Sequence, residues 1–148
     1  MSQLHLFLVL HTLSAVIWIG GMITARLVVH PIGLQFEDMQ QRIERNLKVT
    51  KRLLWLVFPF AVLSIVTGIV ISSGNRSPTV HIKESIWLIM FLNYLFIFYR
   101  SRVATRAFNN FDINGARKVM APIANLSLPI NIILGIMAIY FGVSLRGA

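Results

Sequence analysis

The chain has 148 residues, of which 56% are hydrophobic and only 13% are charged. Its mean hydropathy of +0.72 excludes an ordinary water-soluble domain, in which charged residues make up about a quarter of the chain. The formal charge of +9 would indicate nucleic-acid binding in a soluble protein. Here the basic residues lie between apolar runs, so membrane topology explains them better and no nucleic-acid partner is expected. The absence of cysteine excludes disulfides, thiolate metal sites and cysteine nucleophiles.

Four apolar runs predict four transmembrane helices, at about residues 4–29, 53–72, 82–99 and 121–145. The first run is long enough to cross the hydrocarbon core of about 30 Å with some tilt. It is not expected to be a signal peptide, because no basic segment precedes it and no small-residue cleavage motif follows. The fold class expected for residues 1–148 is therefore all-α, a single membrane domain with four helices in a bundle, and a kink is expected at Pro129.

The link between the first two runs has the pattern of a short amphipathic helix. From Glu37 to Arg52 the acidic residues come first and the basic residues cluster last, which suits the helix dipole. Apolar residues recur at intervals of three or four. This segment is expected either to lie on the membrane surface or to extend the second span into the cytoplasm. Its apolar residues are Phe36, Met39, Ile43 and Leu47.

Basic residues are divided unequally between the two sides of the predicted bundle. The two links that join spans one to two and three to four carry ten, and the other side carries three. The positive-inside rule then predicts that both links are cytoplasmic and both termini periplasmic in a bacterial inner membrane. The ten are Arg42, Arg45, Lys48, Lys51, Arg52, Arg100, Arg102, Arg106, Arg117 and Lys118, and the three are Arg76, Lys83 and Arg146.

His11 is the most informative polar residue, because an imidazole below the membrane surface is uncommon without a partner or a function. At about 100° per residue it shares one helical stripe with Ser14, Trp18 and Gly21. This stripe is expected to face the bundle interior, beside another helix or a flat ligand. His11 is accordingly a candidate metal ligand, and Trp18 and Gly21 are candidate cofactor-binding residues.

A second polar cluster opens the third span. His81, Lys83 and Glu84 lie there at a depth compatible with that of His11, so one cofactor in this half of the membrane could touch both groups. We predict His81 as a second metal ligand and Lys83 as a cofactor-binding and catalytic residue. The alternative is that His81 and Lys83 are interfacial side chains that reach the lipid headgroups.

The donor set favours haem among the possible metal cofactors. Haem iron accepts a neutral imidazole, and helical bundles hold haem between their helices. Copper(I) prefers thiolate and thioether ligands, whereas this chain has no cysteine and its methionines are scattered. Zinc hydrolysis would require three protein ligands and a general base, and the outer histidines have only Glu84 near them. Haem b is therefore the expected cofactor and copper a less favoured one.

The ordered motifs resemble those of the HemJ-type protoporphyrinogen oxidase family and of the wider CopD-domain group of small membrane proteins. The resemblance covers about the first two thirds of the chain. It implies a bundle of four or five helices that binds b-type haem or a porphyrin, with a haem-ligating histidine at the position of His11 and a functional lysine at the position of Lys83. The last span departs from the family pattern, because the run from Asn125 to Pro129 lacks an acidic residue. The motifs that carry the resemblance are His11-x6-Trp18-x2-Gly21 with Arg26 and His30, Lys51-Arg52-Leu53 with Pro59 and Gly68, and His81-Ile82-Lys83.

Three functions fit these residues. The first is a haem-b-binding redox protein of the inner membrane, acting on a porphyrin or quinone-type molecule or in electron transfer, and if it is an enzyme, a membrane oxidoreductase. The second is copper homeostasis through the outward histidines His5, His11 and His81. The third is a non-catalytic subunit that joins a homo-oligomer or a larger membrane complex through small residues of the last span. Membrane lipid is a partner in each case.

Overall fold

The computed structural model describes residues 2–33, 35, 38–74 and 77–147, with side chains as far as Ser144. The predictions for Phe36, Glu37, Arg76 and the Arg146 side chain fall outside the described parts. The described residues form helices joined by short links, and four helical stretches are long and apolar enough to cross a membrane. The predicted all-α four-helix bundle is therefore confirmed. The stretches are Gln3–Gly33, Met39–Ser72, Pro78–Asn109 and Ile113–Ser144.

Two of the four long helices are interrupted by a π-helical turn. The first comprises α1 (Gln3–Thr24), the π turn η1 (Ala25–Val29) and α2 (His30–Gly33). The second and third are the unbroken helices α3 (Met39–Ser72) and α4 (Pro78–Asn109). The fourth comprises α5 (Ile113–Pro122), the π turn η2 (Ile123–Ser127) and α6 (Leu128–Gly147).

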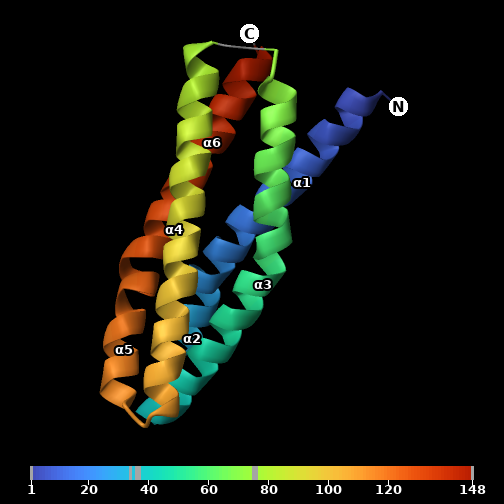
Figure 1. The fold of residues 1–148 in the computed structure, drawn as a ribbon. Helices are drawn as coiled ribbons and strands as arrows, with labels where there is room; N and C mark the ends of the chain where they lie inside the picture. Colours follow the sequence, from blue (N-terminus) through green and yellow to red (C-terminus); the bar gives the residue numbers. More distant parts are fainter. Residues whose placement is uncertain (1, 34, 36–37, 75–76, 148) are drawn as a thin grey trace.

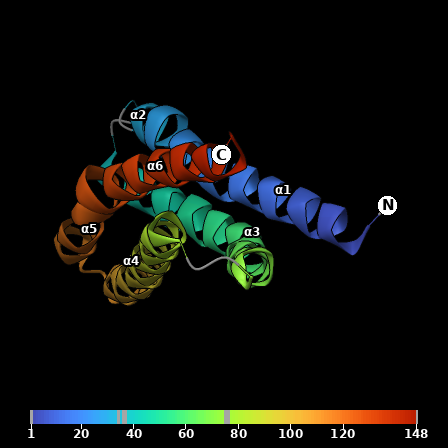
Figure 2. The same cartoon turned by 90° about the horizontal axis from the view of Figure 1, so that it is seen from above.

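The helices pack so that both chain ends lie at one end of the bundle, here called the termini end (Figure 1). α1 packs most extensively against α3, and α4 packs against α3, α5 and α6. The first turns of α1 diverge from the other three long helices in both views (Figures 1 and 2). This divergence leaves space beside α1 at the termini end.

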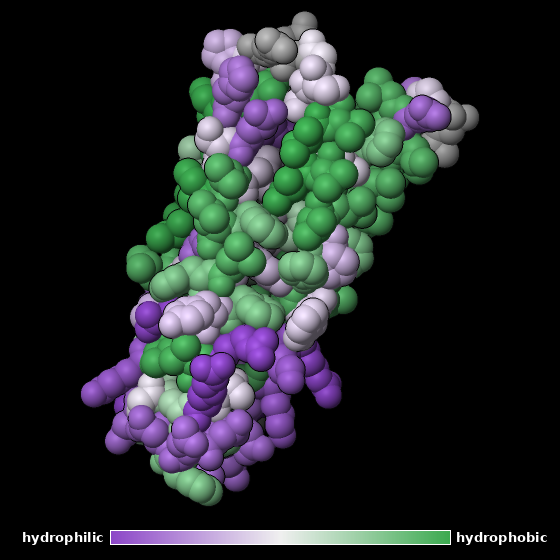
Figure 3. All heavy atoms as spheres, viewed as in Figure 1, coloured by the Kyte–Doolittle hydropathy of each residue, from purple (hydrophilic) through white to green (hydrophobic). Residues whose placement is uncertain are grey.

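The surface has the pattern of a membrane protein. A broad hydrophobic band covers the middle of the molecule, and hydrophilic side chains gather at the end opposite the termini, here called the basic end (Figure 3). Trp55 and Tyr99 are largely exposed near this border, as is typical of side chains at a membrane interface. Arg100 and Arg102 stack over Phe96 and Phe98 at 5.4 Å and 5.8 Å from the ring centroids. The hydrocarbon layer therefore ends close to these residues.

The helices continue beyond the membrane at the basic end. α3 begins at Met39 rather than near residue 53, and α4 ends at Asn109 rather than at residue 99. A second core of Ile43, Leu47, Ala104 and Ala116 buries the apolar sides of these polar extensions. The predicted amphipathic segment is thus an extension of the second span rather than a helix on the membrane surface.

A proline follows each π turn. Pro31 and Pro129 have no N–H to donate, so each removes one bond from the hydrogen-bond ladder of its helix. In the turn before each proline, a backbone hydrogen bond spans one residue more than in an α-helix. The N–H of His30 donates to the Ala25 carbonyl, and the N–H of Leu128 donates to the Ile123 carbonyl. The first span therefore continues to Gly33, beyond the predicted end near residue 29. The irregularity expected at Pro129 takes the form of η2.

Candidate functional site

The His11 side chain is held by α3 from one side. It is only 6% exposed, and its Nδ1 atom lies 2.9 Å from the Ser64 carbonyl oxygen and 3.0 Å from Thr67 Oγ1. A carbonyl only accepts, so Nδ1 carries the proton and donates. The Thr67 hydroxyl donates to the Leu63 carbonyl at 2.7 Å and therefore accepts from His11. In the neutral ring this tautomer leaves the lone pair on Nε2, the atom that can ligate a metal.

Close packing of α1 on α3 makes this arrangement possible. A Cβ atom at Gly68 would lie 3.1 Å from Cε1 of His11, so only a glycine leaves room for the imidazole at its observed position. The Trp87 indole of α4 meets the imidazole edge-on, with the ring centroids 6.0 Å apart. The imidazole of α1 is therefore held in place by residues of both α3 and α4.

His11 forms part of the wall of a cavity of about 730 Å³ at the termini end. The cavity lies among the first turns of α1, the last turns of α3 and the first turns of α4, and it reaches Gly142 of α6. Its lining is mainly apolar, with Lys83 and Glu84 as charged members. The Lys83 ammonium extends toward α6, because a Cβ at Gly142 would lie 3.2 Å from its Nζ atom. Glu84 accepts a hydrogen bond of 3.1 Å from the Ser72 hydroxyl.

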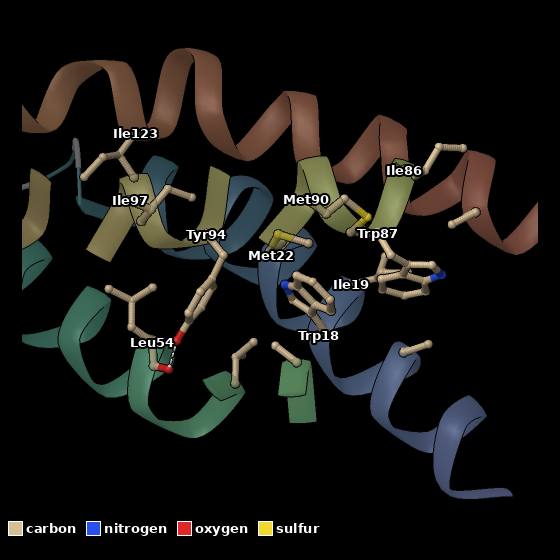
Figure 4. Close-up of a cluster of buried hydrophobic side chains, with 14 residues drawn as sticks. Trp18, Ile19, Met22, Leu54, Ile86, Trp87, Met90, Tyr94, Ile97 and Ile123 are labelled. Carbon is tan, nitrogen blue, oxygen red and sulfur yellow. Dashed lines mark hydrogen bonds between the residues drawn. The ribbon is translucent and has the colours of Figure 1, made fainter. Parts of the chain in front are cut away.

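The predicted inward stripe of α1 is confirmed, since His11, Ser14 and Trp18 are all buried. Trp18 lies in the main hydrophobic core, with its ring 5.1 Å from that of Trp87 (Figure 4). Gly21 meets α3, where its Cβ would lie 3.2 Å from Val57 Cγ2. Both positions are outside the lining of the His11 cavity, and Gly21 lines a separate small cavity of about 60 Å³.

The structure separates the two residues of the second predicted cluster. Lys83 lines the cavity together with His11. The His81 side chain is 65% exposed, and its Nδ1 atom lies 3.8 Å from Glu84 Oε2, outside the cavity lining. Within the described parts of the chain, no three histidine or acidic side chains gather as a metal-binding group. Of the predicted metal and catalytic residues, His11 and Lys83 line this cavity and His81 does not.

Several polar atoms in this region have no hydrogen-bond partner among the described residues. They include two buried atoms of cavity-lining residues, Ser64 Oγ and Trp87 Nε1, and two atoms deeper in the bundle, Ser14 Oγ and Trp18 Nε1. Buried polar atoms are usually paired, so unpaired ones beside a cavity are typical of a ligand site. Ser64 and Thr67 are not among the residues predicted for this site. The signal for them was a pair of hydroxyl residues on one face of an otherwise apolar span.

The fold and the surface define a four-span helical membrane protein. No protein-family model and no solved structure matches the chain. It is similar to an uncharacterized protein of Aquifex aeolicus (strain VF5), with 30% identity in an alignment of 148 positions that covers 96% of this chain and 94% of that protein. The chain therefore belongs to the same family as the A. aeolicus protein.

Proposed function

We propose that this protein binds haem b in the cavity at the termini end and acts as a redox protein of a bacterial inner membrane. The observation that carries the proposal is the position of His11, which is buried within a span, is held through Nδ1 by α3 and contributes to the cavity wall. Iron-ligating imidazoles are typically oriented in this way, by a hydrogen bond from the other ring nitrogen. The resemblance to the HemJ and CopD-like group supports the same assignment.

The residues around the cavity fit the parts of a haem. Its volume of about 730 Å³ lies within the range of small-molecule sites, about 300–1,000 Å³. The apolar lining suits the macrocycle, and the Lys83 ammonium suits a propionate carboxylate. Haem bound there would supply reversible one-electron chemistry at its iron.

The protein's own residues would hold and shield the group. His11 would supply a nitrogen ligand to the iron, while Ser64 and Thr67 fix the orientation of its ring. Lys83 would neutralise a carboxylate, and the Trp87 ring packs against the imidazole in the cavity lining. A porphyrin or quinone-type molecule is the class of substrate that such a membrane-facing apolar site suits.

Substitution of His11 tests this proposal. Wild-type protein purified from haem-replete cells is expected to show a Soret band, and His11→Ala is expected to lose most of it because no other described residue supplies an imidazole to the cavity. His5→Ala is the matched control, since His5 lies six residues earlier on the same helix and outside the cavity lining. Haem content per protein is measured from the absorption spectrum. Equal haem content in the two variants would argue against His11 as the ligand.

Gly68 offers a more conservative test of the same site. In Gly68→Ala the new methyl group would meet Cε1 of His11 at 3.1 Å, so the imidazole has to shift and haem affinity is expected to fall. Gly20→Ala is the control, because nothing lies within 4 Å of a Cβ there and alanine favours a helix by up to about 1 kcal/mol. Haem titration of both variants measures the difference. Unchanged affinity in Gly68→Ala would show that the close contact does not position the ligand.

We also propose that the basic end is cytoplasmic, as the positive-inside rule predicts. The chain has no cysteine, so single cysteines report topology without interference. Ser2→Cys is expected to react with a membrane-impermeant maleimide added to intact spheroplasts. Asn110→Cys, in the exposed link between α4 and α5, is expected to react only after lysis. The reverse labelling pattern would invert the proposed orientation.

A further inference from the structure

Aromatic rings form a continuous row from His11 to the basic end of the membrane span. All three tryptophans of the chain belong to it, although they come from three different helices. The core part of the row is drawn in Figure 4. Successive ring centroids are 6.0 Å apart for His11 and Trp87, 5.1 Å for Trp87 and Trp18, 6.4 Å for Trp18 and Tyr94, 6.5 Å for Tyr94 and Phe58, and 6.3 Å for Phe58 and Trp55.

The surroundings of the three indoles differ in a way that matters for oxidation. Trp18 and Trp87 are 0% and 8% exposed, and neither Nε1 atom has a hydrogen-bond partner among the described residues. Figure 4 shows these two nitrogens pointing away from each other. An oxidised Trp18 has no acceptor for its proton among the described residues, so it is restored by taking an electron from its neighbour. Trp55 is 56% exposed near the polar border of the span, where its indole proton can pass to water.

Tyr94 lies between the buried indoles and Trp55 but is a poor trap for the oxidising equivalent. Its hydroxyl donates to the Leu54 carbonyl, and a carbonyl is not a base that can take the phenolic proton. Oxidation of tyrosine to a stable radical requires loss of that proton. The Tyr94 and Phe58 rings therefore connect Trp18 to Trp55 without holding the charge.

We propose that this aromatic row carries single electrons from Trp55 at the basic end to an oxidant in the His11 cavity. In each passage the oxidant gains one electron, Trp87 and then Trp18 are oxidised and restored in turn, and Trp55 finally loses one electron and its indole proton. The row lets electrons reach the cavity from the opposite side of the membrane without a second cofactor.

The inference rests on the proposed function only for haem in the cavity, and it names a hydroperoxide as a further class of substrate that would be reduced there. Each hydroperoxide takes up two electrons and two protons and leaves as an alcohol and water. A lipid-soluble quinol beside the exposed Trp55 supplies both electrons, and it becomes a quinone as it releases two protons. Atoms and electrons therefore balance over two passages along the row.

A photo-oxidation experiment tests the row without haem. Because the chain lacks cysteine, Leu88→Cys creates a single attachment point in the cavity lining for a ruthenium polypyridyl sensitiser. Illumination with a soluble cobalt(III) electron acceptor then generates ruthenium(III) beside Trp87, and peptide mass spectrometry maps the oxidised tryptophans. The labelled Leu88→Cys protein is expected to accumulate oxidation at Trp55. Adding Trp18→Phe is expected to abolish Trp55 oxidation and confine the product to Trp87.

Two further variants make the result decisive. Tyr140→Phe lies off the row and is expected to leave the pattern unchanged, since Tyr140 pairs with Phe141 instead. Trp55→Phe changes a largely exposed ring and leaves the core intact, so this variant can test the row if Trp18→Phe fails to fold. It is expected to raise oxidation at Trp18 and Trp87. Trp55 oxidation that persists in Trp18→Phe, or buried-indole oxidation that does not rise in Trp55→Phe, would overturn the proposal whether or not the protein binds haem.

Discussion

Replacing Trp18 with alanine is expected to destabilise the bundle by about 3–5 kcal/mol, the range typical of emptying a large aromatic site in a packed core. Trp18 is 0% exposed and its ring contacts those of Trp87 and Tyr94 on α4. In a membrane, helix association depends on such packing because lipid is as apolar as the core, so the lost contacts are not offset elsewhere. Val16→Ala is the control on the same helix, since Val16 is 61% exposed to the lipid side.

Thermal unfolding of the purified variants in detergent measures this difference. The midpoint of Trp18→Ala is expected to fall well below that of wild type, while Val16→Ala stays close to wild type. Equal midpoints for the two variants would mean that α1 does not depend on this tryptophan for its position. The result would also contradict the assignment of Trp18 to the core rather than to the cofactor site.

Asn131→Asp is expected to be nearly as costly, by about 2.5–3.5 kcal/mol, the range for a charge placed at the centre of a membrane span. Asn131 is 0% exposed on α6, where it accepts from Asn93 Nδ2 at 2.8 Å and donates to the Met90 carbonyl at 3.2 Å. An aspartate keeps the first bond, loses the second and adds a buried charge. Asn93 also donates to the Ser127 carbonyl, so this network ties α4 to η2.

Asn131→Leu separates the effect of charge from that of hydrogen bonding. It removes both bonds without adding a charge, and it is expected to cost about 0.6–1.7 kcal/mol, as measured for hydrogen bonds between membrane helices. Expression level and the unfolding midpoint of both variants give the comparison. If the leucine variant proved as unstable as the aspartate variant, hydrogen bonding rather than burial of charge would dominate at this position.

The number of helices could be predicted from the sequence because hydropathy alone decides which segments enter lipid. Their full lengths could not. The segment from Met39 to Arg52 is polar, yet it forms the first turns of α3 because Ile43 and Leu47 pack with residues such as Ala104 and Ala116 on α4 and α5. Packing of this kind depends on tertiary structure, so the lengths of the apolar runs do not predict it.

The candidate site was predictable in part for a similar reason. His11 stands out because an imidazole is costly in lipid. Its hydrogen-bond partners Ser64 and Thr67 could not be assigned, because the sequence does not say which helix lies beside α1. His81 and Lys83 are two residues apart, so on a helix they point in different directions and only one of them can face the cavity. The structure shows that it is Lys83.

Pulsed electron paramagnetic resonance of the ferric protein, prepared with ¹⁵N-labelled histidine, tests the central claim most directly. Coordination by Nε2 of His11 predicts a ¹⁵N coupling to the iron that is present in wild type and in His5→Ala and absent in His11→Ala. Protein that contains no haem, or a ¹⁵N coupling that persists in His11→Ala, would contradict the proposed site.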